Sequence, residues 1–113
     1  MFNTLKIKKQ YFILCLGVVF SSCLTNIDEE QEIDPCTTVT FSAEVKPIID
    51  ANCVQCHGTG GNFPNLTTYQ GVSGNASNVK SQVVSRKMPI GSTLTDAEIQ
   101  AISCWVDAGA INN

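Results

Sequence analysis

The sequence has few of the residues that build most protein metal sites and nucleic-acid interfaces. It contains a single histidine, His57, and only 7 lysines and arginines against 10 aspartates and glutamates among 113 residues. A structural zinc site usually takes four cysteine or histidine ligands in two close pairs, whereas Cys36 and Cys104 lie far from the Cys53 and Cys56 pair. With so little positive charge, nothing in the composition indicates nucleic acid as a partner.

The sequence also lacks an apolar run long enough to span a membrane. The run at residues 11–20 is about half of the roughly 20 residues that a membrane-crossing helix needs. It follows Lys6, Lys8 and Lys9 and leads into small residues, which is the layout of a secretory signal. We therefore expect residues 1–22 to be a signal peptide that is not part of the fold.

The end of this signal, Phe20-Ser21-Ser22-Cys23, resembles the bacterial lipobox, in which cleavage exposes a cysteine that receives diacylglycerol. We expect a lipid at Cys23; the alternative is an ordinary cleavage site nearby and a stray thiol. Residues 23–35 are polar and acidic, so we expect a flexible tether whose charge serves solvation or sorting to the cell surface. The chain would then be lipid-anchored to a bacterial membrane in the cell envelope, facing the periplasm or the cell surface.

One motif has a spacing that indicates its chemistry. Cys53-Val54-Gln55-Cys56-His57 is a C-x-x-C-H sequence, the attachment signature of covalently bound c-type haem. Each thiol adds across one vinyl group of the porphyrin, and the adjacent imidazole of His57 becomes the proximal iron ligand. A C-x-x-C pair can instead be a redox-active dithiol, but a thioredoxin-like site needs a βαβ context, and the sequence around Cys53 has little β patterning.

A six-coordinate iron needs a second axial ligand, and the choice in this chain is narrow. Once residues 1–22 are removed, Met88 is the only methionine, and there is no histidine besides His57. Met88 precedes Pro89 in a predicted loop and is separated from His57 by enough chain to reach the opposite haem face. We expect His/Met ligation, which raises the reduction potential; the alternative is that Met88 fills a gap in the core.

The remaining cysteines are assigned by counting. Cys15 leaves with the signal peptide, Cys23 takes the lipid and two cysteines take haem, so Cys36 and Cys104 remain. An otherwise unused pair in an exported chain predicts a disulfide. It would join the two ends of the folded region, residues 36–113, and stabilise that region by roughly 4 kcal/mol in the chain-entropy model.

The folded region has the pattern of a short series of helices. Apolar residues at helical spacing predict a helix over residues 41–52, in which Pro47 either opens the second part or introduces a kink. Glycines and Pro64 predict a loop, and two further helices are expected at residues 65–72 and 77–87. The core is thin, so we expect haem to complete it and the haem-free chain to be poorly folded.

The last predicted helix has clear signals at both ends. Thr95 and Glu98 form a capping box, and Leu94 and Ile99 are placed for a hydrophobic staple. Gly109 is a suitable C-terminal stop. We therefore expect a helix that begins just after Thr95 and ends just before Gly109.

Together these features resemble the class I cytochrome c domain. The resemblance covers about residues 41–112 and is carried by the C-x-x-C-H motif, the downstream Met88-Pro89 pair and the capped final helix. It implies an all-α fold, a small helical domain around one covalently bound haem c. In that fold the first and last helices cross, which would bring Cys36 close to Cys104.

The resemblance also implies which residues surround the haem. The ring would lie edge-on in a cleft that holds the four ligating side chains. Its walls would be formed by Pro64, Leu66, Tyr69 and Ile99. For Trp105 we expect packing at the helix crossing rather than a place in the cleft. Arg86 and Lys87 could meet a haem propionate or a redox partner, although exposed charges near a loop are more often simply solvated.

The sequence thus predicts a mono-haem c-type cytochrome that transfers single electrons through a haem ligated by His57 and Met88 and is not itself an enzyme. We expect a monomer whose partners are redox proteins, such as a reductase, an oxidase or a dehydrogenase, and which contacts the membrane through its lipid. Three alternatives stay open: a haem-based sensor or small haem catalyst with a displaceable sixth ligand, a haem-free dithiol module, and a subunit of a larger redox complex.

Overall fold

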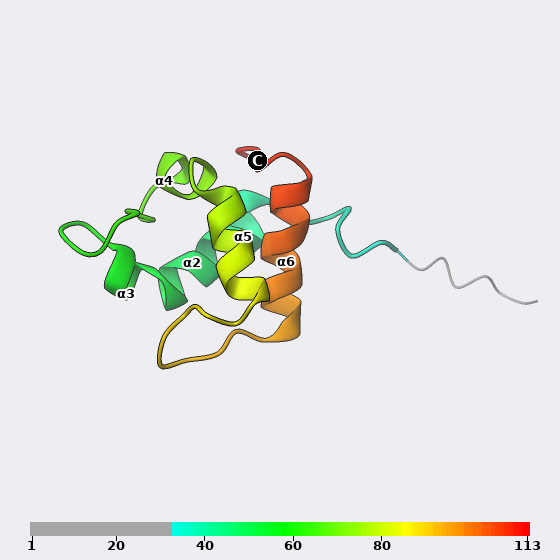
Figure 1. The fold of residues 1–113 in the computed structure, drawn as a ribbon. Coiled ribbons are helices and arrows are strands. Elements are labelled where there is room, and N and C mark those ends of the chain that lie inside the picture. The colour runs from blue at the N-terminus through cyan, green and yellow to red at the C-terminus, as the bar shows by residue number, and fades with distance from the viewer. Residues whose placement is uncertain (1–32) are drawn as a thin grey trace, which may run out of the picture. The chain divides into compact units, whose positions relative to one another are not determined.

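The computed structural model describes residues 33–113, and about half of them are helical (Figure 1). The elements in chain order are η1 (Phe41–Val45, a π-helical turn), α2 (Lys46–Asn52), α3 (Val54–His57), α4 (Tyr69–Ser73), α5 (Ala76–Val84) and α6 (Asp96–Asp107). No strand occurs within residues 33–113, so the all-α prediction is confirmed for this part of the chain. None of these helices is long and apolar enough to cross a membrane. The predicted signal peptide (1–22), the lipid site at Cys23 and most of the predicted tether lie outside the described residues.

The predicted helix over residues 41–52 is present as two consecutive parts, η1 and α2. Thr40 caps the first part: its hydroxyl accepts a hydrogen bond from the Ala43 amide (3.2 Å), and the Glu44 carboxylate accepts one from the Thr40 amide (2.7 Å). Pro47 stands in the first turn of α2, where its missing N–H breaks no helical hydrogen bond. Pro47 therefore opens the second part of the helix.

Helix α6 begins and ends where the sequence predicts. The Thr95 hydroxyl accepts from the Glu98 amide at 3.2 Å, and the Glu98 carboxylate accepts from the Thr95 amide at 2.8 Å, which completes the capping box. At the other end Gly109 has φ +100°, and its amide and the next one donate to carbonyls in the last turn of the helix. These two bonds form a Schellman motif, in which glycine occupies the position that needs a left-handed backbone.

The core is centred on α6, which packs against η1 and against α5. The Trp105 ring is buried and lies 5.2 Å from the Phe41 ring between centroids, while its indole N–H donates to the Ile111 carbonyl at 2.8 Å. Trp105 therefore packs between helices, as expected, and does not line the cleft. The other buried apolar residues of the core are Val45, Ile49, Leu66, Val72, Ala76, Val79, Val83, Leu94 and Ile102.

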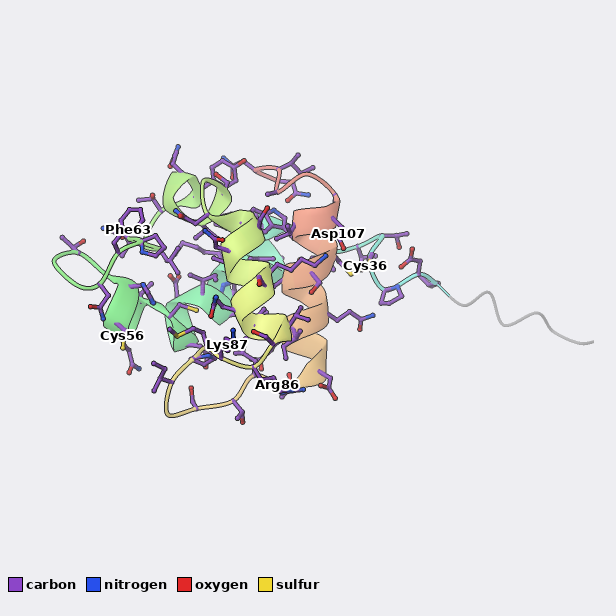
Figure 2. All side chains as sticks on the ribbon, viewed as in Figure 1. Cys36, Cys56, Phe63, Arg86, Lys87 and Asp107 are labelled. Atoms are coloured by element: carbon purple, nitrogen blue, oxygen red, sulfur yellow. A yellow bond between two sulfur atoms is a disulfide. The ribbon has the colours of Figure 1, made fainter. Side chains whose placement is uncertain are left out.

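The predicted disulfide between Cys36 and Cys104 is confirmed, with Cα atoms 5.1 Å apart and a sequence separation of 68 residues. It joins the exposed segment before η1 to a buried position on α6 (Figure 2). The chain end lies near η1, because the side chain of Asn113 accepts from the Phe41 amide (2.7 Å) and its backbone carbonyl from the Ser42 amide (3.1 Å). Both ends of the described chain are thus tied to the packed pair of η1 and α6.

The two middle helices are shorter than predicted. In place of the first part of the helix expected at residues 65–72, the Asn65 side chain accepts hydrogen bonds from the amide (3.0 Å) and hydroxyl (2.7 Å) of Thr67. Such local side-chain bonds compete with helix formation, so α4 begins later. The helix expected at residues 77–87 is α5, which ends early because Arg86 enters the left-handed region with φ 56°.

Candidate functional site

A cleft of about 650 Å³ opens between the α2–α3 segment, α5 and the loops that follow them. Its size is typical of cofactor sites, which occupy roughly 300–1,000 Å³. The four side chains predicted to bind haem all line it: Cys53, Cys56, His57 and Met88. None of the lining residues is aspartate, glutamate, lysine or arginine. The other lining residues are Ala51, Asn52, Gln55, Asn62, Phe63, Pro64, Leu66, Asn78, Val79, Gln82, Val83, Pro89, Ile90, Gly91 and Ser92.

The two cysteines and the histidine lie on successive helical turns. Cys53 connects α2 to α3: its amide donates to the Ile49 carbonyl (2.8 Å), and its carbonyl accepts from the amides of Cys56 (3.2 Å) and His57 (2.8 Å). Residues three apart on such a turn share one face, which brings both thiols to the same side. Both are free cysteines; Cys53 is half-buried and Cys56 is exposed.

The imidazole of His57 is held by a backbone carbonyl. Its Nδ1 lies 3.1 Å from the carbonyl oxygen of Pro64. Because a carbonyl oxygen can only accept, Nδ1 donates this hydrogen bond, and in the neutral imidazole Nε2 is then the nitrogen with the lone pair. The backbone is fixed as well, since the His57 carbonyl accepts from the Leu66 amide at 2.7 Å. His57 thus presents a basic nitrogen in a defined ring orientation.

The loop after α3 packs closely against the helix that carries His57. The Asn62 amide donates to the Cys56 carbonyl at 2.8 Å. A Cβ atom at Gly61 would lie only 2.4 Å from the same carbonyl oxygen, so the loop can approach this closely only with glycine at that position. The same loop continues to Pro64, whose carbonyl orients the imidazole. The glycine therefore contributes to the orientation of His57.

Met88 reaches the cleft from a separate element, the loop of residues 85–95 between α5 and α6. Its amide donates to the carbonyl of Gln82, in the last turn of α5, at 3.3 Å. The Met88 side chain is half-buried, lines the cleft and does not belong to the buried core. This placement differs from that of a methionine that fills a gap in the core.

The prediction of the cleft walls is correct for two residues and wrong for two. Pro64 and Leu66 line the cleft. Tyr69 does not, because its ring packs edge-on against a core aromatic residue and its hydroxyl donates to the Ala110 carbonyl at 2.8 Å. Ile99 borders a smaller cavity instead of the main cleft. Both residues are therefore used for packing rather than for the site.

One wall of the cleft could not be identified from the sequence. Val79 and Val83 of α5 are buried and line the cleft. Their spacing of one helical turn predicts a buried face, but periodicity does not reveal what that face covers. Two exposed apolar side chains at the cleft, Phe63 (89% exposed, Figure 2) and Ile90 (80% exposed), also carried no signal in the sequence.

Arg86 and Lys87 are not among the residues that line the cleft (Figure 2). The guanidinium of Arg86 donates to the Leu94 carbonyl at 3.2 Å and forms an ion pair with Asp96. Lys87 is exposed. For Arg86, where we expected solvation, a haem propionate or a redox partner, the structure shows bonds to residues at the start of α6.

One of the two thiols lies in surroundings that disfavour its charged form. Burial raises the pKa of the Cys53 thiol above its ordinary value, because desolvation penalises the thiolate. A reactive dithiol usually has one cysteine with a lowered pKa, so Cys53 lacks that activation. In addition, no three side chains of cysteine, histidine, aspartate or glutamate come together within residues 33–113 to hold a metal ion.

Comparisons of the chain with protein-family models, with characterised proteins and with solved structures found no match. The function must therefore be inferred from the residues of the cleft and their geometry.

Proposed function

We propose that this chain is a mono-haem c-type cytochrome that carries single electrons. Cys53 and Cys56 would hold the porphyrin through thioether bonds, and His57 and Met88 would be the axial ligands of the iron. The observation that carries the proposal is that these four side chains, contributed by two separate segments, line one cleft of cofactor size. Met88, the only methionine of the proposed mature chain, thus lies at the same cleft as the C-x-x-C-H motif, although the two are distant in the sequence.

The hydrogen bonding of His57 supports its role as the proximal ligand. Metal-bound histidines commonly donate their second ring N–H to a carbonyl or a carboxylate, which fixes the ring and raises its basicity. The bond between Nδ1 of His57 and the Pro64 carbonyl is of this kind and leaves Nε2 available. The ring is therefore already in the tautomer that iron ligation requires.

The walls of the cleft suit a flat apolar group. Val79 and Val83 provide a buried apolar surface on α5, and Phe63 and Ile90 provide exposed apolar surface on the two loops. A porphyrin packed against α5 would remove the exposed apolar surface of Phe63 and Ile90 from water, which is favourable by about 25 cal/mol per Å². Because no charged side chain within residues 33–113 lines the cleft, binding would not require the desolvation of a charged side chain of this region.

The lining residues also favour an electron carrier over a haem catalyst. Haem iron held by histidine and methionine gains or loses one electron while both ligands stay bound. No carboxylate or lysine lines the cleft to act as a general acid or base, and the single imidazole is assigned to the iron. The contribution of the chain is then ligation, orientation of the ring and partial exclusion of water.

The cellular setting is also a proposal, and the disulfide supports it. A structural disulfide such as Cys36–Cys104 persists in oxidising compartments and is rare in reducing ones, which fits an exported protein. We propose that residues 1–22 direct export, that Cys23 carries the lipid, and that the folded domain exchanges electrons with redox proteins of the bacterial cell envelope.

The first test is the visible spectrum of the full-length chain, produced with its signal peptide in a host that matures c-type haem. We expect a sharp c-type band after reduction and a weak far-red sulfur-to-iron band in the oxidised protein. Met88→Ala should abolish the far-red band, whereas Ile90→Ala, which changes a neighbouring side chain of the same cleft, should keep it. High-spin haem in the parent protein would favour the sensor or catalyst, and absence of haem would exclude all three haem functions.

A further inference from the structure

The loop of residues 85–95 is closed by one side chain. Arg86 stands at its start, and its guanidinium donates to the Leu94 carbonyl and pairs with the Asp96 carboxylate at its end. These partners lie 8 and 10 residues further along the chain. Arg86 therefore links the end of α5 directly to the start of α6, and the segment that carries Met88 spans between the linked ends.

The backbone conformation of Arg86 shows that this link has a cost. The amides of Arg86 and Lys87 donate to the carbonyls of Val83 (3.1 Å) and Gln82 (3.0 Å), so α5 ends in a Schellman motif, as α6 does. In α6 the left-handed position is occupied by Gly109, but in α5 it is occupied by arginine, with φ 56°. A residue with a Cβ atom is strained there, whereas glycine is not. The arginine side chain must supply an interaction that offsets this strain.

On the basis of the proposed haem ligation, we propose that Arg86 is a positioning residue for Met88. By closing the loop onto α6, it holds the Met88 thioether in the cleft. Arg86 and Met88 border the same small cavity, together with Leu94, so the link lies directly behind the ligand. Without the guanidinium, the hydrogen bond from the Met88 amide to the Gln82 carbonyl remains. The end of the loop, at Leu94 and Asp96, is then no longer bonded to its start.

The effect of this link is local. The side chains of Arg86 and Asp96 are 52% and 93% exposed, so their ion pair is screened by water and salt and adds little to the stability of the whole domain. A small contribution is nevertheless sufficient to shift the equilibrium between a loop with Met88 in the cleft and a loop with Met88 outside it. The link therefore controls the occupancy of the sixth ligand position more than it controls unfolding.

Competition by imidazole measures this occupancy directly. Imidazole is titrated into the oxidised, haem-loaded full-length protein, and replacement of Met88 is followed in the visible spectrum. Arg86→Gly is the informative variant, because it removes the guanidinium with the rest of the side chain, and glycine keeps the left-handed turn without strain. We expect the apparent affinity for imidazole to rise about 2- to 5-fold, the size expected for loss of one exposed, hydrogen-bonded ion pair. Added salt should raise the affinity of the parent protein but not that of Arg86→Gly.

Three further variants separate positioning from general stability. Asp96→Asn should act in the same direction as Arg86→Gly, and Arg86→Lys should restore part of the parent behaviour because it keeps the charge without the planar fork. Lys80→Ala is the matched control, since it breaks another ion pair between α5 and α6, with Asp107, away from the loop. It should leave imidazole affinity unchanged. The urea midpoint should change little in all four variants.

Each result has a distinct meaning. Equal imidazole affinity in the parent and Arg86→Gly, or an equal rise in Lys80→Ala, would overturn the positioning role of Arg86. Met88→Ala should bind imidazole far more tightly than the parent, because no ligand has to be displaced. If it does not, or if the parent carries no haem, the proposed His57/Met88 ligation itself is wrong, and the role of Arg86 falls with it.

Discussion

The two sides of the cleft are held in different ways. On the His57 side, the turn that carries the ligand continues directly from α2, and backbone hydrogen bonds fix it on both sides. The imidazole has its own carbonyl partner in Pro64. On the other side, Met88 is carried by the loop that Figure 1 shows between α5 and α6. The ends of this loop are linked by the exposed side chain of Arg86.

The proposed ligand His57 is thus held rigidly, whereas the hold on the proposed ligand Met88 is adjustable. Backbone bonds near the C-x-x-C-H motif are local in sequence and are not weakened by salt to the degree that an exposed ion pair is. The His57 side should therefore stay intact under conditions that displace Met88. Substitutions on either side of the cleft can break this contrast.

The largest effect is expected when the attachment on the His57 side is removed. Replacement of both Cys53 and Cys56 by alanine should abolish covalent haem, because no thiol remains to form a thioether bond. Haem staining after denaturing electrophoresis measures this directly. Met88→Ala should keep the stain, since it removes an axial ligand and no covalent bond. Loss of staining in Met88→Ala, or retention in the double cysteine variant, would contradict the assigned roles.

Removal of the Cys36–Cys104 disulfide should lower the free energy of unfolding by about 2–5 kcal/mol, because the bond closes a long loop across the domain. Changing both cysteines to alanine avoids a free thiol, and urea unfolding gives the value. The bond lies at η1 and α6 rather than at the loop that carries Met88, so imidazole affinity should stay near that of the parent in native buffer. A large rise in imidazole affinity would show that the Met88 side depends on the whole domain.

Gly61→Ala should disturb the His57 side specifically. The new Cβ atom would lie 2.4 Å from the Cys56 carbonyl oxygen, so the loop must move away from α3. We expect a loss of about 1–3 kcal/mol in unfolding free energy, together with a changed ferric spectrum as the Pro64 carbonyl shifts relative to His57. Thr59→Ala, an exposed change in the same loop, is the control. If both variants match the parent, the close packing of this loop is not what orients the imidazole.

The smallest effect concerns acid stability at η1, away from the cleft. The backbone amide of Thr40, and then its hydroxyl, donate to Glu44 and lower the pKa of that carboxyl below its ordinary value of 4.5. Glu44 therefore binds a proton more readily in the unfolded chain than in the folded one. Its hydrogen bonds to Thr40 stabilise the fold fully above pH 4.5, and this stabilisation is lost as the pH falls through the lower pKa of the folded state. The free energies of unfolding of the parent and of Glu44→Gln, measured with urea, should differ at neutral pH and become equal in acid. A difference that persists in acid would contradict this origin.

Local signals in the sequence predicted the elements that depend on local bonds. The capping box at Thr95 and Glu98 and the stop at Gly109 define α6, because each is satisfied within one helical turn. The disulfide was predicted by counting the cysteines of a chain expected to be exported. The C-x-x-C-H motif likewise needs only its own turn to bring Cys53 and Cys56 to the same side.

The sequence did not predict the features that depend on tertiary packing. A tyrosine such as Tyr69 suits a cleft wall in its chemistry. Its hydroxyl instead donates to the carbonyl of Ala110, which is distant in sequence. The early end of α5 depends on Arg86 in a left-handed conformation that propensity disfavours for arginine. Its partners at the start of α6 are visible only once the loop is folded. These are the places where side chains from separate elements decide the conformation.

The central claim is that His57 and Met88 bind one iron from opposite sides of the cleft. X-ray absorption at the iron edge of the oxidised, haem-loaded protein tests it most directly, because sulfur and nitrogen ligands give different scattering. The account predicts one sulfur ligand besides nitrogen ligands in the parent, and loss of that sulfur in Met88→Ala but not in Ile90→Ala. An iron bound only by nitrogen in the parent, or a sulfur that survives Met88→Ala, would contradict it.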